Sequence, residues 1–236
     1  MYYVMSDLTG CLNSWKKMLA KIGFSDRDEM FILGNVIDYG KFPIDLLEEM
    51  MTFSNVYPLL GTNEYRFLHL MQGIPADVTQ SHLSAILSPA QRQAFSGWVR
   101  DGGRTTYEQF MRRSVDDREA ILDYLSEFAL YEELKIGKER YLLAHSGIRN
   151  FVPDKSLDSY SPEDFLFDEP VPGKPYFENR MMIVGHTPTM EVSPDSLGKI
   201  FSSEYFINVN CGCIRHKDGG TLGCLCLDTM EEIYLL

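Results

Sequence analysis

Several polar residues stand directly after short apolar runs, or a few positions beyond them, and their side chains could act together. They are Asp7, Asn35, Asp38, Asn63, Glu64, His145 and His186. Carboxylate, amide and imidazole groups are the oxygen and nitrogen donors that divalent metal ions take in proteins. The sequence therefore predicts a candidate metal site, provided that the fold brings these positions to one place.

The apolar runs themselves are typical of strands in an α/β sheet. Within residues 1–71, a short apolar run, a break rich in Gly, Asp and Asn, and a stretch with helical apolar spacing follow one another three times. Further strand candidates lie at 140–144, 181–185 and 205–209. In such sheets ligands bind beyond the carboxyl ends of the strands, so we expect the polar residues to converge there.

The stretch from about residue 75 to about residue 134 predicts a helical insert that forms a lid or wall over the sheet. Ser88 followed by Pro89 is typical of a helix start, and the pair Asp116 and Glu119 resembles a capping box. Residues 101–103, Asp-Gly-Gly, predict a break between two helices. No linker divides the chain, so we expect a single domain over residues 1–236 that carries this insert.

Composition and charge narrow the class of protein. The chain has 34 acidic and 22 basic residues, a formal net charge of −12, and 44% hydrophobic residues, which excludes intrinsic disorder. An acidic chain without a basic run is repelled by nucleic-acid backbones. The longest apolar stretches are far shorter than the ~20 residues of a membrane span, and the first residues lack the basic segment of a signal peptide. We therefore expect a cytoplasmic protein with neither nucleic acid nor membrane as a partner.

Five cysteines, an odd number, favour reduced thiols over a disulfide framework. Four of them stand near the C-terminus. If Asp218 and Gly219 formed a two-residue hairpin turn, Cys213 would face Cys224 and Cys211 would face Cys226, with all four on one face. A Cys₄ metal site has this residue count, but C-x-C spacing on flat strands splays the sulfur atoms. Buried packing residues are the favoured interpretation.

The motif order SDLTG, GNVIDYG, GTNE, HSGI and GHTPT resembles that of the calcineurin-like metallophosphoesterases. The resemblance is strongest to the branch of bacterial serine/threonine protein phosphatases and diadenosine tetraphosphatases, which carries GD-x-HG, GD-x-VDRG, GNHE, H-x-G and GHTP. It implies a four-layer αββα sandwich of the α/β class (α+β by some schemes). It also implies two metal ions that activate a hydroxide to attack a phosphate ester.

Carried over position by position, the resemblance implies metal ligands at Asp7, His145 and His186, with Asn35 as a fourth candidate. Asp38 and Glu64 also stand as the family has them. Other positions depart from the family: Thr9 and Asn63 replace histidines, Asn35 replaces a bridging Asp, Thr62 replaces an Asn ligand, and Tyr39 replaces a phosphate-binding Arg.

These departures remove charge from the site that the resemblance implies. Neutral Thr9 and Thr62 are weak ligands and Asn35 brings no negative charge, so a two-metal centre is not expected. One weakly bound Mn, Fe or Zn ion, or no ion, is what the remaining donors allow. General acid catalysis contributes about 10²–10⁴-fold, and Asn63 cannot supply it as a His can.

Besides the candidate metal ligands, the site has candidate catalytic residues and candidate substrate-contacting residues. Asn63 and Asp38 are the candidate catalytic residues, although Asp38 is equally well explained as the cap of the helix near Ile44. Tyr39 and Arg104 are candidates for contact with substrate, because both can donate hydrogen bonds to phosphate oxygens.

Two main hypotheses follow. The first is a pseudophosphatase that binds a phosphorylated small molecule, a phosphoprotein or another protein partner through the former active-site crevice. The second is an active metal-dependent phosphoesterase, similar to a serine/threonine phosphatase or a dinucleotide polyphosphate hydrolase, that uses a reduced one-metal site. A purely structural subunit is a third class, which only the loss of family residues favours.

Overall fold

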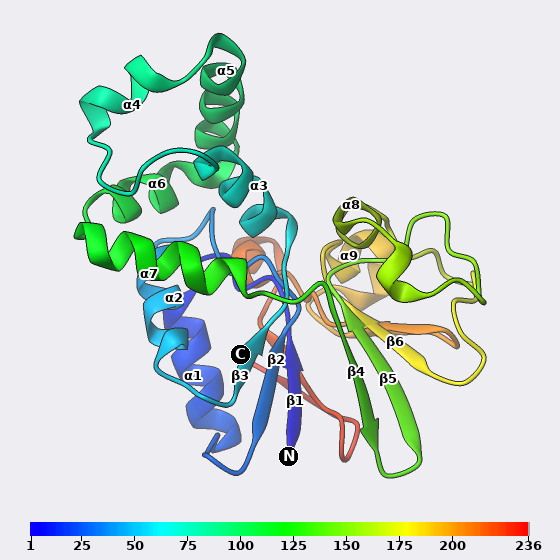
Figure 1. The fold of residues 1–236 in the computed structure, drawn as a ribbon. Coiled ribbons are helices and arrows are strands. Elements are labelled where there is room, and N and C mark those ends of the chain that lie inside the picture. The colour runs from blue at the N-terminus through cyan, green and yellow to red at the C-terminus, as the bar shows by residue number, and fades with distance from the viewer. Residues whose placement is uncertain (236) are drawn as a thin grey trace.

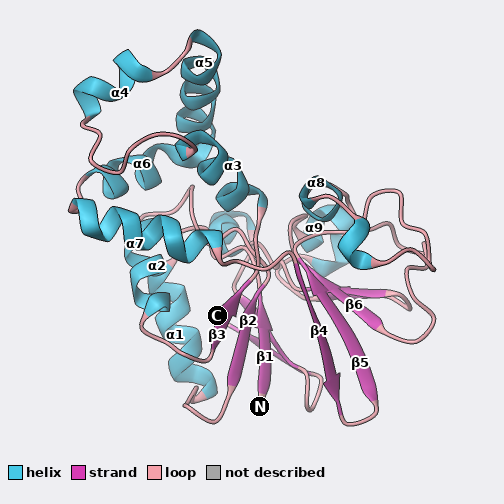
Figure 2. Cartoon of the chain, in the orientation of Figure 1, coloured by secondary structure: helices cyan, strands magenta, loops and turns pink. Residues whose placement is uncertain are grey.

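The computed structural model describes residues 1–235, with the side chains of Gln80 and Ser84 left out. In this range the strands form two five-stranded mixed sheets (Figures 1 and 2). The first has the order β10-β9-β1-β2-β3, with β1 Tyr2–Met5, β2 Glu29–Ile32, β3 Val56–Pro58, β9 Gly223–Cys226 and β10 Glu231–Tyr234. The second has the order β4-β5-β6-β8-β7, with β4 Tyr131–Ile136, β5 Glu139–Ala144, β6 Met181–Val184, β7 Phe201–Ser202 and β8 Phe206–Asn208.

The two sheets pack face to face and carry helices on their outer faces, which makes a four-layer αββα sandwich. Side chains alternate along the strands, so Val4 lies between the sheets while Tyr3 and Met5 face the helices. The expected fold class is thus confirmed. Helices α1 Leu12–Ile22, α2 Pro43–Met51 and α3 Thr62–Met71 belong to the first sheet's side, and α8 Pro162–Leu166 and α9 Thr189–Val192 to the second's.

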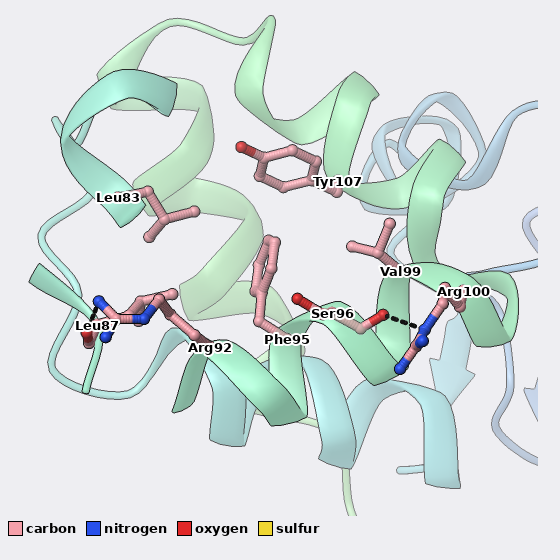
Figure 3. Close-up of a pocket in the computed structure, with 8 residues that line it drawn as sticks. All are labelled: Leu83, Leu87, Arg92, Phe95, Ser96, Val99, Arg100 and Tyr107. Carbon is pink, nitrogen blue, oxygen red and sulfur yellow. Dashed lines mark hydrogen bonds between the residues drawn. The ribbon is translucent and has the colours of Figure 1, made fainter. Parts of the chain in front are cut away.

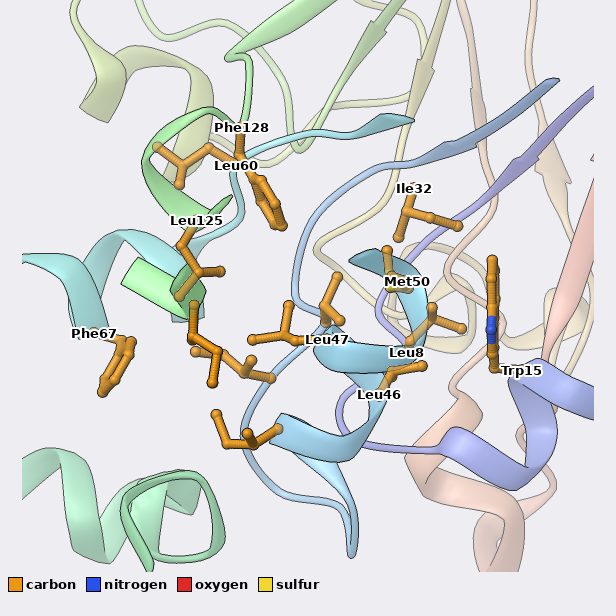
Figure 4. Packing of buried hydrophobic residues seen from close by; sticks show 14 of the residues in the cluster. Leu8, Trp15, Ile32, Leu46, Leu47, Met50, Leu60, Phe67, Leu125 and Phe128 are labelled. Carbon is orange, nitrogen blue, oxygen red and sulfur yellow. The ribbon is translucent and has the colours of Figure 1, made fainter. Parts of the chain in front are cut away.

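The core beneath α1 and α2 contains the largest buried cluster. Trp15 of α1 and Leu47 and Met50 of α2 lie in it with Ile32 of β2 (Figure 4). The apolar spacing that predicted these helices therefore places their apolar faces on the sheet. No helix within residues 1–235 is both long and apolar enough to cross a bilayer.

The helical insert consists of α4 Gln80–Ile86, α5 Pro89–Trp98, α6 Arg104–Met111 and α7 Val115–Ser126. In Figure 1 helices α4, α5 and α6 stand beyond the carboxyl ends of the first sheet's strands. The insert ends before residue 134, because residues 131–136 form β4 and pair antiparallel with β5 from Tyr131 opposite Ala144 onward. The sequence pattern did not predict this strand. β4 lies at the edge of its sheet, and apolar and polar residues alternate only weakly over residues 131–136.

Local signals inside the insert were partly correct. Ser88 caps α5 and forms a capping box with Gln91, as its position before a proline indicated. The box expected at Asp116 and Glu119 is wrong, because the cap of α7 is Ser114, whose Oγ accepts the N–H of Asp117. The break at 101–103 is confirmed: Gly102 has φ +96°, a conformation that favours glycine.

Asp38 joins the sheet side of the molecule to the insert. Its fully buried carboxylate accepts hydrogen bonds from Trp98 Nε1 (2.8 Å) and Thr106 Oγ1 (2.7 Å). Burial raises the pKa of Asp38 to about 6, against the lowering effect of these two bonds. The expectation that Asp38 caps the helix near Ile44 is wrong, because Ile44 N donates to Gln109 Oε1 instead.

The C-terminal hairpin differs from the sequence expectation. Cys213–Asp218 form a 3₁₀ helix, and the hairpin joins β9 to β10, with Glu231 opposite Cys226. The four cysteines therefore do not share one face: Cys211 lies between the sheets, whereas Cys213, Cys224 and Cys226 lie in the cluster beneath the helices. All four are buried and free, as expected of packing residues.

The Asp38 contacts predict a measurable coupling between sheet and insert. Asp38→Asn should lower the free energy of unfolding by about 1–3 kcal/mol, because the amide cannot accept from both donors. Trp98→Phe removes the N–H donor and part of the indole ring, so it should lower the free energy of unfolding by a similar amount. The double variant should be less destabilised than the sum of the two, by about 1 kcal/mol.

Urea unfolding at neutral pH measures these differences. Asp123→Asn, at an exposed position of α7, is the matched control and should be within experimental error of the wild type. Strict additivity of Asp38→Asn and Trp98→Phe would show that the bond contributes nothing.

Candidate functional site

The predicted site residues converge at the carboxyl ends of the central strands. Asp7 follows β1, Asn35 follows β2, and Asn63 lies in the first turn of α3 just after β3. His145 and His186 follow β5 and β6 of the other sheet. A chain of hydrogen bonds joins them, and we call this set of five residues the Asp7 cluster.

Asp7 and Asn35 form the centre of the cluster. Asn35 Nδ2 donates to Asp7 Oδ1 (2.8 Å), and the backbone N–H of His186 donates to Asp7 Oδ2 (2.9 Å). Asp7 is buried, and desolvation raises its pKa to about 7 although both hydrogen bonds lower it. The carboxylate is therefore stabilised by neutral donors, which do not balance its charge.

Asn63 is committed to the loop that surrounds the cluster. Its side-chain Nδ2 donates to the carbonyl of Ile37 (3.0 Å), and its backbone N–H donates to Asn35 Oδ1 (3.0 Å). Thr62 Oγ1 donates to the same Asn35 oxygen (3.1 Å). The amide of Asn63 thus acts as a structural hydrogen-bond donor, and the candidate catalytic role of this residue stays a prediction.

The two histidines lie side by side. His145 Nδ1 is 2.6 Å from the carbonyl oxygen of Leu33, which can only accept, so this nitrogen carries the hydrogen. His145 Nε2 then has a free lone pair and lies 3.1 Å from His186 Nδ1. Burial lowers the pKa of His145 to about 3 and also lowers that of His186, so both rings are neutral at physiological pH.

The cluster offers an incomplete donor set for a metal. The 3.1 Å between the two histidine nitrogens suits a hydrogen bond, and it also suits two ligands that each lie about 2.0–2.1 Å from one ion. However, no three His, Cys, Asp or Glu side chains in residues 1–235 are grouped closely enough to hold an ion. The Asn35 amide donates a hydrogen bond to Asp7 Oδ1, an oxygen that would have to ligate an ion, and it brings no charge of its own. The residues present do not fit a two-metal centre.

The backbone around the cluster adopts conformations that L-residues rarely use. Asp7 (φ +50°), Asn35 (φ +53°) and His186 (φ +63°) lie in the left-handed region, and so do Asp38 and Tyr39. Each such residue costs on the order of 1–3 kcal/mol, so positions of this kind concentrate at functional sites. Left-handed backbone is therefore concentrated in the loops that surround the Asp7 cluster.

Glu64 organises these loops, a role that the sequence did not reveal. Its carboxylate accepts backbone N–H groups of Asn35 (2.9 Å), Val36 (2.8 Å), Ile37 (3.0 Å) and Gly61 (3.0 Å). Burial raises its pKa to about 7. The sequence singled out Glu64 as part of the GTNE motif, but the signal for this particular role was its place three residues after Gly61, in the capping-box pattern of α3.

Asn210 is a second positioning residue that sequence reasoning left without a role. It follows β8 as the other polar residues follow their strands, and its Nδ2 donates to the carbonyl of His186 (2.8 Å). Its own Oδ1 accepts the N–H of Gly212 (3.1 Å). Asn210 therefore fixes the strained backbone of His186.

Tyr39 and Arg104 lie outside the Asp7 cluster. The ring of Tyr39 is half exposed and rests on Gly102, where an added Cβ would come within 2.6 Å of the ring. Arg104 is the exposed first residue of α6. Within the described residues neither side chain hydrogen bonds to the cluster, so their contact with substrate stays a prediction.

The insert contains a pocket of its own. A cavity of about 550 Å³ lies among α4, α5 and α6, with Leu83, Phe95 and Tyr107 pointing into it and Arg92 and Arg100 at its edge (Figure 3). Both arginines donate to backbone carbonyls. None of the lining residues belongs to the Asp7 cluster.

A protein-family model described as Calcineurin-like phosphoesterase matches residues 2–206. Among curated proteins, the symmetrical bis(5'-nucleosyl)-tetraphosphatase of Acidovorax sp. (strain JS42) is 30% identical over 100 residues, which are 42% of this chain and 36% of the relative. That of Paracidovorax citrulli (strain AAC00-1) is 23% identical over 159 residues, 66% of this chain and 48% of the relative. The chain thus spans less than half the length of these relatives.

Solved structures agree in fold. One protein, assigned provisionally as a diadenosine tetraphosphatase, has a TM-score of 0.66 at 14% identity and covers 99% of this chain and 92% of its own. A protein serine/threonine phosphatase from Saccharomyces cerevisiae has a TM-score of 0.54 at 13% identity, over 94% of this chain and 71% of its own. At these identities the similarity shows the fold alone.

The Glu64 contacts lead to a stability prediction. Glu64→Gln should destabilise the protein by about 2–4 kcal/mol, because the amide nitrogen would face backbone N–H donors and leave them buried without an acceptor. Urea unfolding at pH 8, where the carboxyl is ionised, measures the change. Glu119→Gln, at an exposed position of α7, is the matched control. A loss no larger than in this control would mean that Glu64 does not hold the loops.

Proposed function

The chain belongs to the calcineurin-like phosphoesterase family, and we propose that it is a catalytically impaired member. In this proposal the Asp7 cluster binds a phosphorylated small molecule, a phosphoprotein or another protein partner without hydrolysing a phosphoester efficiently. The buried Glu64 holds the strained loops around the cluster, while residues of other types stand at the positions where the family's motifs have metal ligands and the proton donor.

The Asn35–Asp7 hydrogen bond is the observation that carries the proposal. A carboxylate at position 35 would lie within 2.8 Å of Asp7, where two negative charges repel each other unless a cation separates them. The amide of Asn35 removes the repulsion and donates a hydrogen bond as well. The centre of the cluster is therefore stable with no metal ion between these two side chains.

The region of the leaving group supports the same proposal. An amide is not an acid near neutral pH, so Asn63 cannot protonate a departing oxygen as a His can, and its Nδ2 already donates to the carbonyl of Ile37. A bound phosphate would meet neutral hydroxyl and amide donors, which contribute less than charge-assisted hydrogen bonds. Binding without turnover, or with very slow turnover, is the expected behaviour.

A second candidate function is a phosphoesterase with a single metal ion. The distance of 3.1 Å between His145 Nε2 and His186 Nδ1 favours this function. His145 Nδ1 donates a hydrogen bond to the Leu33 carbonyl, and in metal sites such a bond fixes the ring so that its second nitrogen, here Nε2, can act as a ligand. His145 and His186 would hold the ion, with Asp7 as the nearest carboxylate. The ion would polarise a phosphoryl oxygen. Phosphoproteins or dinucleotide polyphosphates are the substrates suggested by the relatives.

Metal content and hydrolysis of p-nitrophenyl phosphate separate the two functions. The impaired enzyme should contain far less than one equivalent of Mn, Fe or Zn and should hydrolyse the ester no faster than buffer. Stoichiometric metal, together with hydrolysis that His186→Gln abolishes at an unchanged melting temperature, would instead establish the one-metal enzyme.

Restoring the family residues tests whether the scaffold is intact. The variant with Thr9→His, Asn35→Asp, Thr62→Asn and Asn63→His should gain a Mn²⁺-dependent rise in melting temperature and hydrolysis about 10²-fold or more above the wild type. Asn35→Asp alone is the control and should only be destabilised in EDTA, because it adds a charge beside Asp7 without further ligands. A quadruple variant that folds but gains no metal would contradict the assignment of these positions.

A further inference from the structure

A large groove lies beside the Asp7 cluster but does not include it. It has a volume of about 1100 Å³ and is bordered by the start of α1, residues 39–42, residues 197–199 and the C-terminal segment. None of the five residues of the Asp7 cluster lines it. Gly10 and Gly40 do line it, and their backbones touch, since a Cβ on Gly10 would lie 3.1 Å from Gly40 Cα.

The groove is cationic in an acidic protein. Lys17, Lys41 and Lys199 line it from three separate segments, together with His216, and no Asp or Glu is among the lining residues. No ion pair joins any of these lysines to a carboxylate in the part of the chain that the structure describes. With a net charge of −12 over the whole chain, an unpaired cationic groove is the surface to which an anion would be drawn.

Apolar and aromatic side chains form much of the remaining lining, beside a few neutral polar residues. Tyr39 presents a ring that is half exposed, and Phe42 lies three residues further along the same wall. The lining also includes Leu197 and Gly198. At Gly198 φ is +66°, and an added Cβ would come within 2.5 Å of the Gly219 carbonyl. Only glycine fits at position 198, because a side chain there would collide with the Gly219 backbone, so the two segments approach closely at this side of the groove.

We propose that this groove binds an organic phosphate that joins a multiply charged phosphate group to a flat, apolar ring system, as a nucleoside diphosphate does. The three ammonium groups contact phosphate oxygens, and the aromatic wall with Tyr39 and Phe42 contacts the ring. The volume is ample for such a molecule, because pockets for small ligands measure about 300–1,000 Å³. The proposal requires no metal and does not depend on the function proposed for the Asp7 cluster.

Titration calorimetry with ADP in the presence of EDTA tests the groove without any metal site. The wild type should bind ADP, and added salt should weaken binding. Lys17→Gln combined with Lys199→Gln should bind at least about tenfold more weakly, because charge-assisted contacts to phosphate oxygens are lost. Lys135→Gln combined with Lys138→Gln changes the charge equally at exposed positions on the β4–β5 hairpin. This control should bind ADP like the wild type.

Other outcomes would overturn the proposal. No ADP binding by the wild type, or equal affinities for the groove variant and the hairpin control, would show that the groove is not an anion site. Inorganic pyrophosphate should bind about tenfold or more weakly than ADP, because it lacks the ring contacts. If it binds as tightly as ADP, the ring system contributes nothing. Lys41→Gln is an independent second variant and should weaken ADP binding at an unchanged melting temperature.

Discussion

The buried carboxylate of Glu64 is the constraint on which the candidate site depends. It accepts four backbone N–H groups from the loops that follow β2 and β3, and buried N–H groups without a partner are costly. The loop that contains Asn35 is thereby tied to the start of α3, so Asn35 reaches Asp7 and Asn63 reaches the Ile37 carbonyl. These hydrogen bonds hold the loops around the Asp7 cluster in place through protein groups alone.

One short loop connects the site with the insert. The backbone N–H groups of residues 35–37 donate to Glu64. The next two residues contact the insert. Asp38 accepts hydrogen bonds from Trp98 and Thr106, and the Tyr39 N–H donates to the carbonyl of Gly102. Trp98 packs on Gly103, where a Cβ would lie 2.1 Å from its ring. The insert is therefore attached to the backbone that positions the candidate site, and its stability and that of the site are linked.

Charge is distributed unevenly over these regions. The Asp7 cluster carries one carboxylate among amides and neutral histidines, while the neighbouring groove carries three lysines without a carboxylate. An active two-metal phosphoesterase concentrates positive charge at its catalytic centre. Among the side chains of this protein, the lysines lie in the neighbouring groove, which is where the proposed anionic ligand would be attracted.

The sequence alone determined the layers of the fold and the set of polar residues at the strand ends. Alternating apolar residues in short runs and helical spacing between them depend only on local geometry, and the motif order specified Asp7, His145 and His186. The tertiary structure alone decided which partners these groups have. The bond of Asp38 to Trp98 spans 60 residues, and the C-terminal cysteines separate because Cys213–Asp218 coil into a 3₁₀ helix instead of a strand. Such contacts depend on which segments pack together, and no local pattern encodes that.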